Sequence, residues 1–169
     1  MQDCLEEGAT NVSKEHLATY LNDHLAGSHT ALETLDRLHA EAEDLRPGLA
    51  QLKKEIEEDR EQLRALMRSL SIAESTVRKA GGWLAERAAS IKLGMDDKAE
   101  GPLRRLERLE LLSLGIEGKI GMWHALETVA VTERLLRVLD YSLLKERGRD
   151  QRARVEAMRL EAGHLALAA

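Results

Sequence analysis

Apolar residues recur every three or four positions along most of this chain, which is the spacing of one face of an α-helix. The first apolar stripe follows Ser13, a residue type that caps helix N-termini. It stops before Pro47, because proline disfavours the helical conformation in the residue before it. A second stripe predicts a helix over residues 48–70, and the short connection makes the two helices antiparallel neighbours. The first stripe consists of Leu17, Leu21, His24, Ser28, Ala31, Leu35, Leu38 and Ala42, and the second of Leu49, Leu52, Ile56, Asp59, Leu63, Leu66 and Leu70.

Ser71 and Glu74 form a capping-box pattern, which predicts that a third helix starts there and runs over residues 72–93. At ~1.5 Å per residue this helix is about as long as the one before it, so it can carry the chain back along the bundle. Residues 94–101 form a polar loop, and Pro102 suits the first turn of the next helix.

The stretch from Leu103 to Glu127 is apolar on almost every side after Arg108, which is typical of a helix buried inside a bundle. Each glycine inside a helix costs about 1 kcal/mol relative to alanine, so glycines retained there need a reason. Three of them recur at intervals of three, at Gly115, Gly118 and Gly121. We expect these to mark a close approach, either by the first helix near Gly27 or by residues 72–93. A narrow polar stripe on the same helix consists of Glu110, Ser113, Glu117 and His124.

A last helix follows a connection over residues 128–139. Asp140 is a suitable N-cap, and the apolar spacing continues to about residue 167. The opposite face, from Lys145 to Arg159, carries dense charge of both signs, which is typical of a solvated face. We therefore expect a flexible acidic segment at residues 1–12 and a single helical-bundle domain over residues 13–169.

Composition narrows the functional classes. The net charge of −5 and the 2% aromatic content argue against a nucleic-acid partner. The chain contains no apolar run long enough for a transmembrane segment, and its acidic N-terminus lacks a signal-peptide core. A single cysteine, Cys4, cannot form an internal disulfide, which fits a reducing compartment, so we expect a cytoplasmic protein. Cys4 has no nearby ordered histidine and no serine has a recognisable base, so nucleophilic catalysis has little support.

Two antiparallel helices, a long helical crossover and two further helices form a pattern that resembles the ferritin-like four-helix bundle. The resemblance is architectural and covers about residues 13–167; it implies an all-α fold with a crossover between bundle helices 2 and 3. Ferritin-like di-iron proteins place glutamates and Glu-x-x-His motifs on facing helices. The only such motif here, from Glu161 to His164, lies at the end of the last helix. The resemblance therefore implies a bundle without a complete di-metal centre.

Polar residues inside or beside the apolar stripes are the candidates for a site. Counting ~1.5 Å per residue from the turn near residue 47 puts Asp59 level with Arg154. A buried carboxylate needs a partner, so we predict a structural Asp59–Arg154 ion pair with no metal beside it. The same count places His24 near His124 and Glu146, a set that would suit zinc, iron or manganese. The alternative for His24 is a neutral core histidine. The five buried polar candidates are His24, Asp59, Glu117, His124 and Arg154.

These features favour a non-enzymatic cytoplasmic helical-bundle protein that acts through protein contacts, as a homodimer or with another protein. The resemblance adds the stress-related settings of ferritin-like proteins as one expected role. These features leave two alternatives open. The first is a metal-binding ferritin-like protein with oxidase or storage chemistry. The second is a bundle that holds a small apolar ligand or lipid between its helices.

Overall fold

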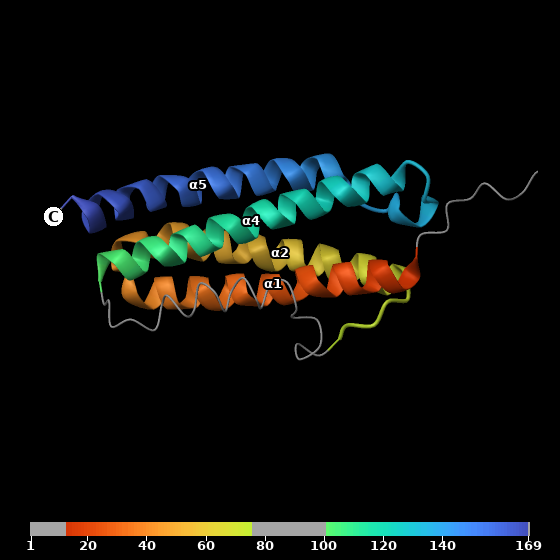
Figure 1. The fold of residues 1–169 in the computed structure, drawn as a ribbon, viewed down its shortest axis with the longest axis horizontal. Helices are drawn as coiled ribbons and strands as arrows, with labels where there is room; N and C mark the ends of the chain where they lie inside the picture. Colours follow the sequence, from red (N-terminus) through yellow and green to blue (C-terminus); the bar gives the residue numbers. More distant parts are fainter. Residues whose placement is uncertain (1–12, 76–100, 169) are drawn as a thin grey trace, which may run out of the picture.

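Four long helices pack into an elongated bundle in the computed structural model, which describes residues 13–75 and 101–168 (Figure 1). They are α1 (Lys14–Glu41), α2 (Arg46–Ser69), α4 (Pro102–Ala130) and α5 (Tyr141–Leu167), with short 3-10 helices at Glu43–Leu45 and Arg134–Leu136. The described ranges contain helices and no strand, so the all-α prediction is confirmed. None of the helices in these ranges has the length and apolarity needed to cross a membrane. The predictions for residues 1–12 lie outside the described part.

The ends of α1 and α5 follow the predicted capping chemistry. The side chain of Ser13 accepts a hydrogen bond from the backbone N–H of His16 at 3.3 Å, and that of Asp140 accepts one from Leu143 at 3.0 Å. Each bond satisfies a backbone donor that has no partner inside its helix.

The end of α2 differs from the prediction. Residues 72–75 are not helical, so the capping-box reading of Ser71 is wrong; the rest of the predicted 72–93 helix lies outside the described residues. Ser71 instead adopts a left-handed conformation, with φ of 53°. Its N–H donates to the carbonyl of Arg68 at 3.0 Å, and the N–H of Ile72 donates to that of Met67 at 2.9 Å. This pair of bonds is a Schellman motif, which ends α2 and buries Ile72.

The chain leaves α2 along α1 and enters α4 at the opposite end of the bundle (Figure 1). Asn22 of α1 holds the departing chain: its Oδ1 accepts from the N–H of Ser75 at 2.7 Å and its Nδ2 donates to the carbonyl of Ala73 at 3.2 Å. The first turns of α4 lie beside the α1–α2 turn, where Arg105 pairs with Asp44. Helix α4 is therefore antiparallel to α1, and α5 returns antiparallel to α4.

The core consists of two apolar clusters placed end to end. One surrounds Trp123 and Tyr141 near the α4–α5 connection, and the other surrounds Leu52 and Leu109 near the α1–α2 turn. Between them lie the buried polar side chains of Asp59 and Gln151. The middle of the bundle is therefore the place where its chemistry departs from simple apolar packing.

Candidate functional site

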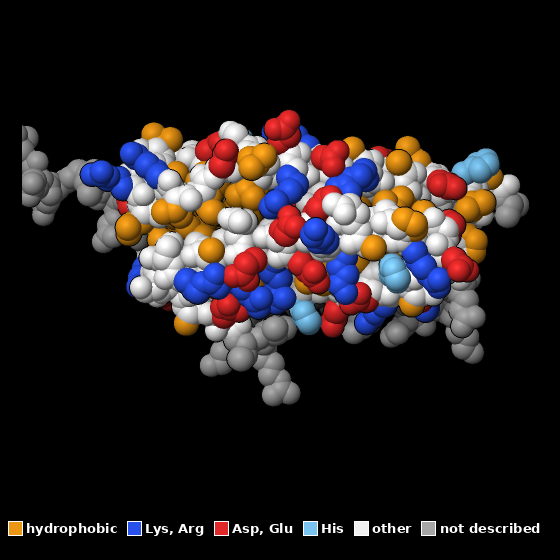
Figure 2. All heavy atoms as spheres, turned by 180° about the vertical axis from the view of Figure 1, so that it is seen from behind, with side chains coloured by type: hydrophobic (Ala, Val, Ile, Leu, Met, Phe, Trp, Pro, Cys, Tyr) orange, Lys and Arg blue, Asp and Glu red, His pale blue; other side chains and the backbone are white. Residues whose placement is uncertain are grey.

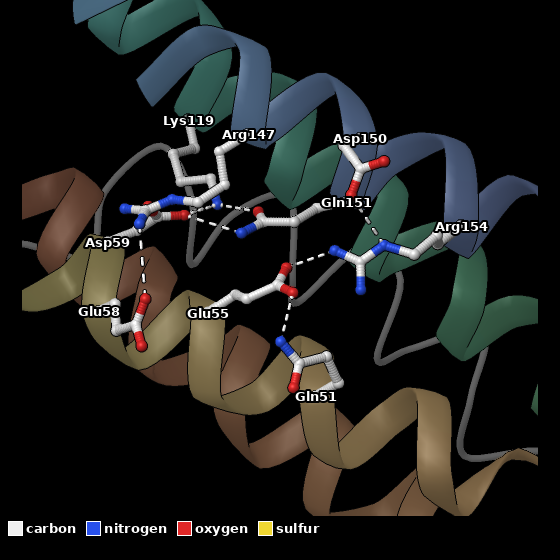
Figure 3. A network of polar contacts seen from close by, with 9 residues as sticks. All are labelled: Gln51, Glu55, Glu58, Asp59, Lys119, Arg147, Asp150, Gln151 and Arg154. Carbon is white, nitrogen blue, oxygen red and sulfur yellow. Dashed lines mark hydrogen bonds and ion pairs between the residues drawn. The ribbon is translucent and has the colours of Figure 1, made fainter. Parts of the chain in front are cut away.

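A buried ion-pair cluster joins three helices at this level (Figure 3). Asp59 of α2 is 2% exposed, and its carboxylate accepts hydrogen bonds from Lys119 of α4 and Arg147 of α5. Gln151 of α5 is fully buried and donates to the same carboxylate at 3.1 Å. Arg147 also reaches Glu58, which is half exposed. The carboxylate thus has the partners that a buried charge requires.

Lys119 is the group whose ionisation is most affected. Burial lowers the pKa of Lys119, and the Asp59 carboxylate acts in the opposite direction. Its ammonium nitrogen also donates to the Oε1 of Gln151. Lys119 is therefore fixed between two acceptors, which suits a structural cation better than a free base.

The predicted Asp59–Arg154 pair is wrong. Arg154 pairs instead with Glu55, one helical turn before Asp59, and with Asp150, whose Oδ2 is 3.0 Å from the Arg154 Nε. Burial alone would raise the pKa of Glu55, but the hydrogen bonds from Arg154 and Gln51 lower it overall. The count of residues from the turn is off by one turn of α5, so that Arg147 and Gln151 meet Asp59.

A groove of about 500 Å³ lies beside this cluster. It runs between α1 and α4, and residues of α2 form its floor. Its α4 wall includes Gly115, Gly118 and Gly121, and its α1 wall includes Gly27. A Cβ atom added at any of the three α4 glycines would meet no neighbouring atom of the described residues within 4 Å. The predicted close packing of these glycines against α1 is therefore wrong, because they leave space open on that side. The alternative, an approach by residues 72–93, lies largely outside the described residues. The close approach in this bundle occurs at Gly148 of α5, where an added Cβ would lie 2.7 Å from the Cγ1 of Ile120.

Trp123, Arg60 and His24 are three of the polar side chains that line this mainly apolar groove. Trp123 is fully buried, and its indole Nε1 has no hydrogen-bond partner in the described part of the chain. The Nε of Arg60 is also buried without such a partner. His24 contacts the edge of the Tyr20 ring, with centroids 4.7 Å apart, and burial lowers its pKa to about 4. His24 is therefore expected to be neutral near pH 7.

The other sequence candidates lie at the surface. Glu117 is at the groove but is exposed and pairs with Arg152 at 3.2 Å. His124 and Glu146 are exposed. Over residues 13–75 and 101–168, no three His, Cys, Asp or Glu side chains gather closely enough to hold a metal ion. The predicted set of His24, His124 and Glu146 is thus not brought together, because α4 turns Trp123 inward and His124 outward.

Sequence reasoning did not identify Lys119, Arg147 or Gln151 as site residues. Two signals were present. Lys119 is the only cation between Arg108 and Arg134, in the most apolar helix of the chain. Gln151 lies in the apolar stripe of the last helix, just as Asp59 lies in that of the second.

The middle of the bundle thus combines a satisfied ion-pair cluster with an open apolar groove that carries unpaired hydrogen-bond donors. Apolar walls with a few polar groups are the usual make-up of a small-molecule site. No family model, curated protein or solved structure matches this chain.

Proposed function

We propose that this protein is a ferritin-like helical bundle without a di-metal centre, and that it binds a small, mainly apolar molecule in the groove between α1 and α4. The observation that carries the proposal is the groove itself. Its volume of about 500 Å³ falls within the range of roughly 300–1,000 Å³ that is typical of ligand pockets. The ferritin-like part is supported by the antiparallel neighbours and by the positions of two helix ends, since α2 ends at one end of the bundle and α4 begins at the opposite end (Figure 1).

The glycines argue that the groove is maintained rather than accidental. Gly115, Gly118 and Gly121 could each hold a side chain without a clash, and each costs about 1 kcal/mol of helix stability relative to alanine. A sequence optimised only for stability would have larger residues there. Retaining open space at the expense of stability is a common feature of binding sites.

Filling the groove is expected to abolish binding. In Gly118→Leu the new side chain enters the open space, so the affinity for the neutral apolar dye Nile red should fall at least tenfold. The thermal midpoint should not fall, because the added Cβ meets no atom within 4 Å. Dye fluorescence titrations and thermal unfolding measure the two effects.

Ala157→Leu is the matched control, because Ala157 is exposed on α5, away from the groove. It should bind the dye as the wild type does. A wild-type protein that binds no dye, or equal dye binding by the Gly118→Leu variant, would contradict the proposal.

A second candidate function is binding of a protein partner or of a second copy of this chain. Four large apolar side chains near the α4–α5 connection are more than half exposed, and Figure 2 shows hydrophobic side chains gathered toward this end of the bundle. Exposed apolar patches often mark contact surfaces. The four are Val131, Leu135, Val138 and Leu143.

If this surface joins two copies, the wild type should be a dimer by light scattering coupled to size-exclusion chromatography. Leu135→Ser combined with Val138→Ser should then give a monomer with an unchanged thermal midpoint. Leu167→Ser, at an exposed residue near the other end of the bundle, should leave the dimer intact. A monomeric wild type would exclude the homodimer.

A further inference from the structure

The polar groups of the groove lie at one end of it. Lys119 of α4 bonds to Asp59 of α2, so these two residues lie at one level of two parallel helices. Arg60 directly follows Asp59, and Trp123 lies one turn beyond Lys119, toward the same end. The two donors are therefore within about one helical turn of each other along the bundle axis, roughly 5 Å.

The far end of the groove is mainly apolar. Toward the α1–α2 turn it is lined by Ala31, Ile56, Leu111 and Leu112, together with Thr34, whose hydroxyl already donates to the carbonyl of Thr30. The groove therefore has a polar end and an apolar end, which is the arrangement expected for a molecule with a head and a tail.

The polar end holds two hydrogen-bond donors that have no acceptor. The indole N–H of Trp123 and the Nε–H of Arg60 are buried without acceptors in the described part of the chain. No carboxylate in residues 13–75 and 101–168 lies within ion-pair distance of Arg60, although burial and Arg64 lower the pKa of Arg60 while the charge of Glu74 raises it. Glu117, which also lines the groove, is exposed and pairs with Arg152. The one buried carboxylate nearby, Asp59, already has three donors. A buried donor left without an acceptor costs about 1–3 kcal/mol, so a ligand that supplies the acceptor is favoured.

We propose that the ligand is an aliphatic carboxylic acid, bound with its carboxylate toward Arg60 and Trp123 and its hydrocarbon tail toward Leu111 and Leu112. This assignment rests on the proposed function, because it specifies the head group of a ligand in the same groove. An arginine and an indole N–H together provide a charge and donors for a carboxylate, whereas the tail needs only apolar walls.

Dodecanoate and 1-dodecanol share a hydrocarbon tail and differ in the head group. Comparing them therefore tests the carboxylate site separately from the apolar groove. The substitution Trp83→Phe leaves Trp123 as the only tryptophan, which makes its emission and its indole N–H signal reporters of the groove. At pH 7.5 dodecanoate should bind at least tenfold more tightly than dodecanol. It should also shift the indole N–H proton downfield, as a new hydrogen bond requires.

Arg60→Gln should remove the preference for dodecanoate while leaving the dodecanol affinity within about twofold of the wild type. Arg64→Gln is the matched control, since Arg64 lies one turn further on α2, pairs with Glu74 and does not line the groove. It should keep the preference.

Equal binding of the acid and the alcohol, or tighter binding of dodecylammonium, would overturn the carboxylate assignment and leave the apolar site standing. Failure of all three compounds and of Nile red to bind would overturn both. A preference for dodecanoate that survives in Arg60→Gln and leaves the indole signal in place would also overturn the assigned head-group site.

Discussion

Replacing Asp59 with alanine is expected to lower the free energy of unfolding by about 3–5 kcal/mol. The change removes the carboxylate that accepts from Lys119, Arg147 and Gln151, and it leaves the Lys119 ammonium buried without its counter-charge. Burial already disfavours the charged form of Lys119, so the loss of Asp59 should push the pKa of Lys119 further down. Urea unfolding at pH 7 measures the loss of stability.

Two variants test the cause of that loss. Glu58→Ala removes the neighbouring, half-exposed partner of Arg147 and should cost less than about 1 kcal/mol. Asp59→Leu combined with Lys119→Met and Gln151→Leu replaces two buried charges and the amide that bonds to both with apolar side chains, and it should recover most of the stability. A triple variant as unstable as Asp59→Ala would show that the stranded charge is not the cause.

Lowering the pH from 6.5 to 4 is expected to cost about 3 kcal/mol of stability through His24 alone. Burial lowers the pKa of His24 from 6.5 to about 4, so in this range the unfolded chain binds a proton that the folded chain does not. The contribution is complete above about pH 6.5 and is lost as the pH falls through this window. Asp59, Arg60 and Lys119 line the same groove, and Tyr20 covers the ring from α1.

The difference between the wild type and His24→Gln isolates this effect from the carboxylates that also titrate at low pH. Urea unfolding at pH 7 and at pH 4.5 should show a smaller loss of stability in the variant. His164→Gln, at an exposed position near the end of α5, should lose as much as the wild type. Equal losses of stability in His24→Gln and the wild type between pH 7 and pH 4.5 would mean that burial does not lower the pKa of this histidine.

Periodicity was sufficient to predict α1, α2, α4 and α5, because burying an apolar stripe is what gives helices of this length most of their stability. Helix termini were predicted correctly where a single side chain determines them, as the N-caps Ser13 and Asp140 do for α1 and α5. Ser71 shows the limit. The pattern from Ser71 to Glu74 can start a helix, yet the backbone bonds of Ile72 and Ser71 end α2 there, and only the three-dimensional path of the chain decides between the two.

The candidate site was less predictable, because it depends on how helices are placed relative to one another. The rise per residue placed Asp59 along the bundle axis to within one helical turn. Identifying which side chain pairs with Asp59 requires a precision better than one turn. The glycines of α4 show a second limit. Their spacing indicates that side chains are absent from one face, and it does not distinguish a face covered by a neighbour from a face that borders a groove.

The ion-pair cluster has one more consequence, which concerns the longitudinal register of the helices. The apolar stripes of α2 and α5 repeat about once per helical turn, so apolar packing alone would tolerate a slip of one helix along another by a turn. Asp59 does not tolerate it, because a slip would separate this carboxylate from Lys119, Arg147 and Gln151 and leave buried charges unpaired. A few polar residues between two apolar clusters thus select a single alignment of the bundle, and with it the position of the groove walls on α1 and α4.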